Sequence, residues 1–454
     1  MPEEVETTIE ILRELLETES EEVLRCLLPD FHPADLALAM SQLSRDEATR
    51  IFSCLSEVLA ADVLAEADEE LIAVLTEDLP DQELSDLLEE MEPDDAADVV
   101  GELEDEGRAR RVLDLMDEED RSDLERLLAH DEESAGGIMT SDYLAFPEFW
   151  TIHQAIGFLR HSQPEIHFTY AFTLDRAGCL QGVFPIQMLV WTDSSVQLKE
   201  IADPEVIRVE GDMDQEEVAR LFLKHDLVSL PVVDAEGKLI GRITSDDVLD
   251  VLQEESSEDI FKLAGTSDDE LITRSILNVL KLRLPWLLVA LLGGIGCSFI
   301  LGKFEVELDK FTYLAFYLPV IMAMGGNVAT QSSTLIVRGL ATGQVHSRKL
   351  FRTILREARV GSLIGLVCAL IAGGLSGLFA RLAGLPPATG LVVGLSMQIS
   401  MTCAGLFGSL VPLTLSRLGV DPAVASGPFI SMSNDAMGLL IYLTVARTLS
   451  IYLI

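Results

Sequence analysis

The sequence predicts a multidomain protein with an acidic all-α superhelical domain, a tandem pair of α/β domains, a linker helix and an all-α transmembrane domain of five helices. Charge and hydropathy lead to this prediction. The first 283 residues carry 70 acidic against 21 basic side chains, a net charge of −49, whereas the last 171 carry 6 against 11, a net charge of +5. The average composition therefore hides an acidic half suited to water and an apolar half suited to a membrane.

The charge also limits the partners and chemistries that we expect. Such acidity argues against nucleic acid as a partner and favours cations, although most of the acids are expected to be a solvated surface. The six cysteines contain no CxxC pair, which argues against a disulfide framework or a zinc site. The N-terminal stretch MPEEVETTIEILREL is acidic and polar, unlike a signal peptide, so this half is expected in the cytoplasm. No nucleophile–base pair or Gly-rich phosphate loop is recognisable, so an enzyme is not expected.

Residues 1–132 show helical periodicity throughout. The stretch HPADLALAMSQL (32–43) recurs sixty residues later as EPDDAADVVGEL (92–103), with Pro in the first helical turn of each copy. LPDQELSDLLEEM (79–91) begins in a similar way. These repeats predict a small superhelix of helical hairpins.

A strand–helix pattern follows twice, in residues 133–200 and 201–255. The hairpin DRAGCLQGV (175–183) recurs 59 residues later as DAEGKLIGR (234–242). Around the second copy, the periodicity predicts strands over EVIRV (205–209) and LVSLPVV (227–233) and helices over 214–225 and 245–255. A tandem β-α-β-β-α unit resembles a pair of CBS domains, a module that senses nucleotides or ions.

That resemblance includes a motif for adenosine ligands, in which a Gly is followed by a hydroxyl residue and then by an Asp that holds the ribose. The second copy carries it as Gly241, Thr244 and Asp247, whereas the first copy has Pro185 and Met188 at the later positions. Thr244 and Asp247 are therefore candidate ligands for ATP or another adenine nucleotide. Because the chain has no P-loop, an ATP-driven pump is not expected.

The linker segment 256–283 precedes a membrane domain over 284–454. A membrane span needs about 20 apolar residues, and the predicted spans are 284–302, 312–337, 360–381, 388–415 and 423–450. Glycines four residues apart, such as Gly361 and Gly365, favour close helix contacts. The loop after the second span contains Arg338, Arg348, Lys349, Arg352, Arg356 and Arg359 and is expected in the cytoplasm, which leaves the C-terminus outside.

One acid interrupts the last apolar stretch, GPFISMSNDAMGLLIYLTVA (427–446). Asp435 would cost several kcal/mol there unless it faces water, a partner or an ion. A structural alternative is that it only bonds Ser433, Asn434 or a neighbouring helix.

The order of these parts resembles the MgtE magnesium channel family, and the likeness extends over essentially the whole chain. The motifs that carry it are ESAGGIMT (133–140), PVIMAMGGNVATQSSTLIVRGLATG (319–343) and LGVDPAVASGPF (418–429). One departure is Ala329, where the family usually has Gly two residues after the Gly-Gly-Asn triplet, and this puts one close helix contact in doubt.

The resemblance implies a homodimer in a bacterial cytoplasmic (inner) membrane, with a pore on its twofold axis lined by the second and fifth spans. Asp435 would face its symmetry mate there, and the other implied pore-lining residues are Gly325, Gly326, Asn327 and Gln331. Two carboxylates suit Mg²⁺, which is reluctant to shed its water and is commonly held by one or two acids.

The resemblance also implies that cytoplasmic Mg²⁺ closes the pore by bridging acids of the soluble half. The implied ligands are Asp62, Asp94, Asp98, Asp214, Glu216, Asp226, Asp247, Asp250, Glu255, Glu258, Asp259 and, at the membrane edge, Asp421. Divalent ions would relieve charge repulsion only in the compact state and so shift the population towards it.

The leading hypothesis is therefore a Mg²⁺-selective channel for magnesium uptake that closes at high cytoplasmic Mg²⁺. One alternative is a carrier that exchanges a divalent cation against Na⁺ or H⁺. Another is a membrane-anchored CBS regulator that senses nucleotide and transports nothing, although polar residues inside two spans speak against a mere anchor.

Overall fold

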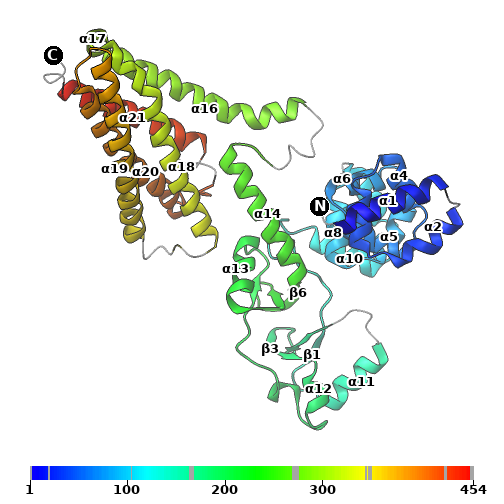
Figure 1. The fold of residues 1–454 in the computed structure, drawn as a ribbon. Coiled ribbons are helices and arrows are strands. Elements are labelled where there is room, and N and C mark those ends of the chain that lie inside the picture. The colour runs from blue at the N-terminus through cyan, green and yellow to red at the C-terminus, as the bar shows by residue number, and fades with distance from the viewer. Residues whose placement is uncertain are drawn as a thin grey trace. The chain divides into compact units, whose positions relative to one another are not determined.

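The computed structural model describes residues 3–18, 21–103, 105–162, 168–267, 276–342, 345, 350–423 and 427–449. It divides into two compact units, residues 1–252 and 253–454, which are described separately below. Figure 1 shows the ribbon with the element labels used here.

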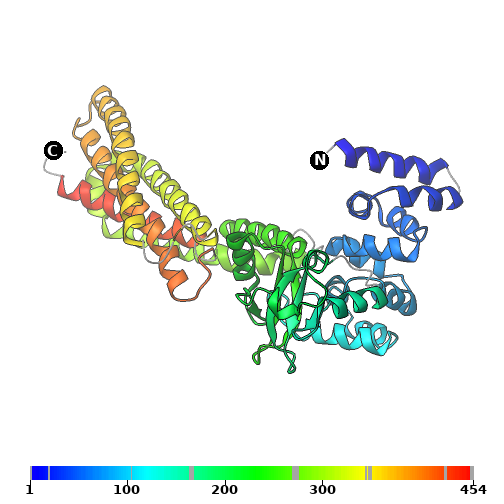
Figure 2. The same ribbon diagram turned by 90° about the horizontal axis from the view of Figure 1, so that it is seen from below.

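The first part of unit 1 is built from short helices. They are α1 (Glu3–Thr18), α2 (Glu21–Leu27), η1 (Leu28–Asp30), α3 (Pro33–Met40), α4 (Arg45–Phe52), α5 (Glu57–Ala65), α6 (Glu69–Thr76), α7 (Asp81–Glu89), α8 (Pro93–Gly101), α9 (Glu106–Leu113) and α10 (Glu118–Leu127). Figure 2 shows them stacked in successive layers.

Local sequence determines where these helices begin. Pro33 and Pro93 occupy the first turn of α3 and α8, where a missing N–H costs nothing. Ser44 and Glu47 form a capping box at α4, and the Asp68 carboxylate accepts a hydrogen bond from the Leu71 N–H at 2.8 Å. The predicted helical repeats are thereby confirmed.

The second part of unit 1 contains two three-stranded sheets of the same topology. The strands are β1 (Ala145–Pro147), β2 (Tyr170–Leu174) and β3 (Leu180–Pro185) in one sheet, and β4 (Val209–Glu210), β5 (Ser229–Val233) and β6 (Leu239–Thr244) in the other. In each sheet the first strand runs parallel to the second, and the second pairs antiparallel with the third. Helices α11 (Ile152–Ser162), α12 (Met188–Trp191), η2 (Leu198–Glu200) and α13 (Gln215–His225) complete the pair.

The repeated hairpins turn at Gly178 and Gly237, which have φ angles of 87° and 82° that L side chains rarely adopt. The tandem pair is therefore confirmed, with one difference in the expected strands. EVIRV forms a ladder only at its end, since Val209 pairs with Val232 and Glu210 with Val233. It is an edge segment that follows Pro204, which has no N–H to donate.

A continuous apolar core runs from the helical repeats into the second α/β domain of unit 1. The ESAGGIMT motif lies at this junction, where a Cβ on Gly137 would collide with the backbone of Asp131 and Glu132. The motif leads to Thr140, whose backbone exchanges hydrogen bonds with that of Arg242 at 2.9 and 3.0 Å. The sequence at the junction thus places the end of the repeats against β6.

The boundary predicted after residue 255 falls inside a helix, three residues from the division between the two units. Helix α14 runs without interruption from Ser245 to Ala264, so the last helix of the tandem pair and the start of the linker are one element. Gly265, with a φ of 78°, follows its end and lets the chain turn. The linker residues 268–275 lie outside the described ranges.

Among the residues that the structure describes, unit 2 contains five helices long and apolar enough to cross a membrane, which confirms the five predicted spans. They are α16 (Ile276–Lys303), α18 (Leu318–Ala341, preceded by η3, Thr312–Tyr317), α19 (Leu350–Leu382), α20 (Thr389–Arg417) and α21 (Pro428–Thr448), with the short α17 (Glu305–Lys310) after the first. Helix α19 begins ten residues before the predicted span because Arg352, Arg356 and Arg359 extend the helix beyond its apolar part. Arg348 and Lys349 lie outside the described residues.

Glycines bring α19 and α20 into backbone contact. A Cβ on Gly373 would lie 2.8 Å from the Gly390 carbonyl oxygen, and one on Gly361 would lie 2.7 Å from the Met401 carbonyl oxygen. The predicted small-residue contacts of the third span are therefore present, and α20 is the most buried span.

Candidate ion pathway and acidic regulatory sites

Helix α18 has a polar face that the described residues of unit 2 leave exposed. Asn327, Gln331, Thr334 and Arg338 are exposed and recur every three to four residues, so they share one side of the helix. Polar side chains on a membrane-spanning helix are expensive in lipid and normally face a water-filled path or another protein surface. Asn327 and Gln331 thus lie on the exposed polar side of α18, and their pore-lining role stays a prediction.

The glycines of the same helix are placed differently. Gly326 is half-buried, and Gly325 is buried within unit 2, where a Cβ would lie 2.8 Å from Asn434 Nδ2 and 3.1 Å from Ser400 Oγ. Successive helical residues are about 100° apart, so Gly325 points well away from Asn327. Gly325 thus packs between α18, α20 and α21, and its pore-lining role stays a prediction.

Asp435 follows the fully buried Asn434 in α21 and is itself half-buried. Within the described residues it has neither a hydrogen bond nor an ion pair, so the alternative that it bonds Asn434 or Ser433 is not realised there. A carboxylate in this position has the chemistry to hold a hydrated divalent cation.

A second group of carboxylates lies in unit 1, where α8 meets the start of α14. Asp94 is only 7% exposed, and its Oδ1 has no hydrogen-bond partner within the described residues. The charges of Asp247 and Glu92 act directly on it. We call Asp94, Asp95 and Asp247 the α8–α14 site.

Burial dominates the electrostatics of this site. Burial, followed by the charges of Asp247 and Glu92, raises the pKa of Asp94 to about 8, and burial with the Asp94 charge raises that of Asp95 to about 8. Burial also raises the pKa of Asp247, although the Thr244 N–H and hydroxyl donate to Asp247 Oδ2 at 3.0 and 2.6 Å. In the described part of the chain, no basic side chain forms an ion pair with these three acids. The charge of Arg242 acts on the neighbouring Glu92, but Arg242 is not among the partners that shift the pKa of Asp94 or Asp95.

A third group lies in unit 2, at the end of α14. The Lys262 ammonium pairs with Asp421 Oδ2 at 2.9 Å and with the Glu258 carboxylate. Burial, followed by the Asp421 charge, raises the pKa of the neighbouring Asp259. Three of the predicted ligands, Glu258, Asp259 and Asp421, are thus brought together, with a lysine among them that the sequence interpretation did not include.

The remaining predicted ligands lie elsewhere. Asp62, Asp98 and Asp250 are exposed on α5, α8 and α14, and Glu255 is half-buried on α14. Asp214 caps α13 by accepting the Glu216 N–H at 2.9 Å, and Glu216 pairs with Arg220 at 3.4 Å. Asp226 ends α13 in a left-handed conformation with a φ of 53°. Asp214, Glu216 and Asp226 thus have local structural roles.

Sequence reasoning missed Asp95, Thr140, Arg242 and Lys262. The spacing of Glu258 and Lys262, four residues apart on a helix, was a usable signal for an ion pair. Arg242 is buried, its Nε donates to the Asp142 carbonyl at 2.6 Å, and its guanidinium lies over the Phe168 ring at 5.1 Å. No local pattern signals that contact, because its partners lie about 100 and 74 residues away.

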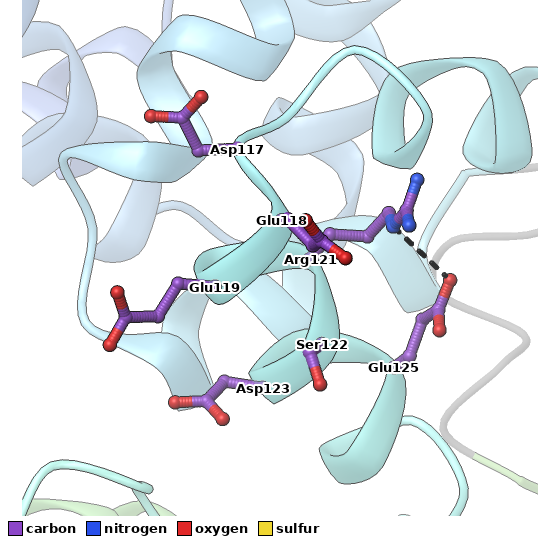
Figure 3. A pocket seen from close by; sticks show the side chains of 7 residues that line it. All are labelled: Asp117, Glu118, Glu119, Arg121, Ser122, Asp123 and Glu125. Carbon is purple, nitrogen blue, oxygen red and sulfur yellow. Dashed lines mark ion pairs between the residues drawn. The ribbon is translucent and has the colours of Figure 1, made fainter.

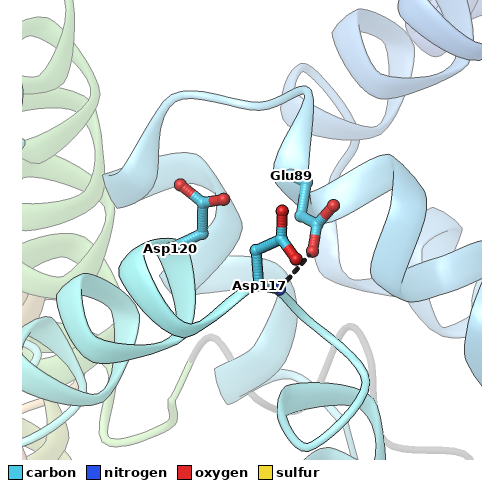
Figure 4. A group of neighbouring side chains, drawn as sticks. All are labelled: Glu89, Asp117 and Asp120. Carbon is cyan, nitrogen blue, oxygen red and sulfur yellow. Dashed lines mark hydrogen bonds between the residues drawn. The ribbon is translucent and has the colours of Figure 1, made fainter.

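The surface of α10 is also acidic. A hollow of about 720 Å³ is lined by residues of that helix and the residue before it, and Arg121 and Glu125 pair across it at 3.8 Å (Figure 3). Nearby, Glu89, Asp117 and Asp120 lie close enough to share a cation, and Glu89 accepts the Asp117 N–H at 2.7 Å (Figure 4). All three are exposed, as solvated acids usually are, so they do not define a site.

Comparisons with known proteins agree with this architecture. A family model described as a divalent cation transporter, MgtE, matches residues 318–445, the MgtE intracellular N domain matches 31–133, and a CBS domain matches 198–254. The magnesium transporter MgtE of Thermus thermophilus is 41% identical over 332 residues, covering 72% of this chain and 73% of that protein. The magnesium transporter MgtE of Bacillus subtilis is 33% identical over 322 residues, covering 70% of each chain.

The soluble half of the chain is also similar in fold to a solved structure. The cytosolic domain of the Mg²⁺ channel MgtE in complex with ATP has a TM-score of 0.51 and 37% identity, covering 53% of this chain and 98% of that one. The Thermus thermophilus relative, at 41% identity over 72% of this chain, is similar enough to show the family. The chain belongs to the MgtE family.

Proposed function

We propose that the chain forms a Mg²⁺-selective channel for magnesium uptake, as a homodimer in a bacterial cytoplasmic membrane with its N-terminus inside and its C-terminus outside. The observation that carries this proposal is the uncovered polar face of α18, with Asn327 and Gln331 on a helix that spans the membrane. A second copy of the chain would shield that face from lipid and enclose a polar path. The relatives named as magnesium transporters support Mg²⁺ as the ion.

Asp435 supplies the charge for this path. Mg²⁺ retains several waters when it binds to one or two carboxylates, so two copies of Asp435 can attract the hydrated ion without stripping it. Asn434, the residue before Asp435, is fully buried, so the helical turn that carries Asp435 is held in place by packing.

The test is Mg²⁺ flux into liposomes that contain the purified full-length protein, with Asp435→Asn compared with wild type. Asparagine keeps the size of the side chain but removes its charge, so we expect Mg²⁺ flux to fall by an order of magnitude or more. Asp309→Asn, which neutralises an exposed acid of α17, is the matched control and should leave flux unchanged. Unchanged flux and selectivity in Asp435→Asn would refute the pore assignment, and uptake that requires Na⁺ or a proton gradient at constant voltage would identify a carrier.

We further propose that cytoplasmic Mg²⁺ favours a compact, closed state by binding at the α8–α14 site. The residues there fit a divalent cation, because Asp94 has a buried oxygen with no partner in the described structure and the cluster has no paired base. Asp94, Asp95 and Asp247 would hold the ion, whose charge offsets the repulsion between them.

We also propose a nucleotide site in the second CBS domain. Thr244 and Asp247 are positioned by their mutual hydrogen bond at 2.6 Å, and the ATP complex of the related cytosolic domain supports ATP as the ligand. Because Asp247 would then serve both nucleotide and cation, Asp247→Ala should weaken ATP binding measured by calorimetry. Heat of ATP binding equal to that of wild type would contradict the assignment.

A further inference from the structure

The end of α14 contacts the start of α21 within unit 2. A Cβ on Gly427 would collide with the Leu263 carbonyl oxygen, and one on Gly265 would lie 3.1 Å from Pro428 Cγ. The same Gly265 position is 3.6 Å from Trp286 Cβ. The last turn of α14 therefore rests on the residues that begin the helix carrying Asp435.

Ionic contacts cross this junction at one point. Lys262 Nζ lies 2.9 Å from Asp421 Oδ2, and its second partner, Glu258, lies one turn earlier on α14. The Lys262 side chain is 29% exposed, so water screens the pair only in part. Burial alone would lower the pKa of Lys262, but the hydrogen bonds with Glu258 and Asp421 outweigh it and raise the pKa.

The charges around Lys262 are unbalanced without it. Glu258, Asp259 and Asp421 are acidic, and the other base whose charge acts on Asp259 is Arg338 of α18. A lysine ammonium is a compact charge that can bond several carboxylate oxygens, as a metal ion does. It cannot share the same oxygens of Glu258 and Asp421 with a divalent cation.

We propose that Lys262 is a positioning residue that acts as a built-in cation: it holds α14 against the start of α21 when divalent cations are scarce, and it competes with them for Glu258 and Asp421. Its consequence for conduction rests on the proposed function. In a channel of this kind, Lys262 would set the fraction of channels that stay closed at low Mg²⁺. It would thereby also set how strongly closure depends on the Mg²⁺ concentration.

The test uses the full-length protein with Trp150→Phe and Trp191→Phe, which leaves Trp286 as its one tryptophan. Trp286 fluorescence in nanodiscs then reports whether the Gly265 turn is docked. In EDTA, we expect Lys262→Gln to lower the ratio of docked to undocked protein about two- to fivefold, the range for a partly exposed ion pair. Lys262→Arg should keep the wild-type ratio, and saturating Mg²⁺ should restore docking in Lys262→Gln because the carboxylates are free to bind it.

A double-mutant cycle identifies the partner. If the pair with Asp421 holds the junction, Lys262→Gln should have little further effect in an Asp421→Asn background. The proposal would be overturned by any of three results. Lys262→Gln could dock as well as wild type in EDTA, its effect could be fully additive with that of Asp421→Asn, or Lys262→Arg could fail to retain docking.

Mg²⁺ flux measured on the same preparations separates this inference from the proposed function. If Mg²⁺ flux is absent but Lys262→Gln and Asp421→Asn are non-additive in the docking assay, transport is refuted and the role of the ion pair is retained. If Mg²⁺ flux is present but the docking effects of Lys262→Gln and Asp421→Asn are additive, the role of Lys262 is refuted and transport is retained.

Discussion

Helices α3 and α8 begin with the same repeated sequence but differ in the acids that follow the proline. In α3 the sequence is Pro33-Ala34-Asp35, and in α8 it is Pro93-Asp94-Asp95. Asp35 of α3 is exposed, whereas Asp94 of α8 is buried. Asp95, which stands at the position of Asp35 in the repeat, has a pKa raised by burial and by the Asp94 charge. The repeat supplies the same helix start twice, and only the second copy places a carboxylate at a junction with another domain.

This difference separates two uses of acidic residues in one domain. An exposed acid such as Asp35 contributes solubility and little else, because water screens its charge. A buried acid without a base destabilises the junction that contains it, and the junction gains stability from any cation that enters. Substitutions that make α8 resemble α3 therefore test whether the α8–α14 site is the sensor.

The largest effect is expected from Asp94→Ala, which gives α8 the residue that α3 has at Ala34. The change removes a buried carboxyl group that must give up its proton before it can bind Mg²⁺. The junction should therefore be compact even in EDTA, and the Mg²⁺ concentration needed for any remaining protection from proteolysis should rise more than about tenfold, as for loss of a metal ligand. Limited proteolysis of the full-length protein across a Mg²⁺ titration, at ionic strength matched with KCl, measures both effects.

Asp35→Ala is the matched control for that experiment and should behave as wild type. Wild-type dependence on Mg²⁺ in Asp94→Ala would show that the closed state is stabilised elsewhere, and the comparison between α3 and α8 would then concern packing alone.

A smaller effect is expected from pH. The pKa values of Asp94 and Asp95 are raised from 3.8 to about 8 in the folded protein, so the folded state holds their protons more tightly than the unfolded state does. Their contribution to stability is complete below about pH 4 and is lost as the pH rises towards 8 in the absence of divalent cations. Mg²⁺ binding at pH 7 should therefore release protons.

Calorimetry of Mg²⁺ binding in buffers with different ionisation enthalpies measures that release. We expect up to about two protons per chain for wild type and fewer for Asp94→Ala with Asp95→Asn. Heats that do not depend on the buffer would contradict the raised pKa values.

Local signals in the sequence were sufficient for most of the fold. Pro33 and Pro93 indicated helix starts, Gly178 and Gly237 indicated hairpin turns, and hydropathy indicated the five spans. The continuation of α14 across residue 255 follows from the same logic, because no Pro or Gly interrupts the helix before Gly265.

The candidate sites were harder to predict because they depend on contacts that no local pattern contains. Ala34 and Asp94 stand at equivalent repeat positions, and the sequence does not reveal which of them meets another domain. Lys262 and Asp421 are 159 residues apart. Gly325 stands two residues before Asn327, and only the orientation of α18 among its neighbours determines that Gly325 faces inward.

The smallest effect is expected from Glu216→Gln. The sequence interpretation included Glu216 among the sensing acids, but it already pairs with Arg220 at 3.4 Å on a partly exposed helix face. Such a pair contributes at most about 1 kcal/mol, and neutralising the acid removes no unbalanced charge, so the Mg²⁺ concentration for half-maximal protection should change less than about twofold. Asp214→Ala is a useful contrast, because loss of the α13 cap should lower stability by about 1 kcal/mol equally with and without Mg²⁺. A tenfold shift in Glu216→Gln would show that acids with a protein counter-charge also sense the ion, and the distinction drawn from α3 and α8 would fail.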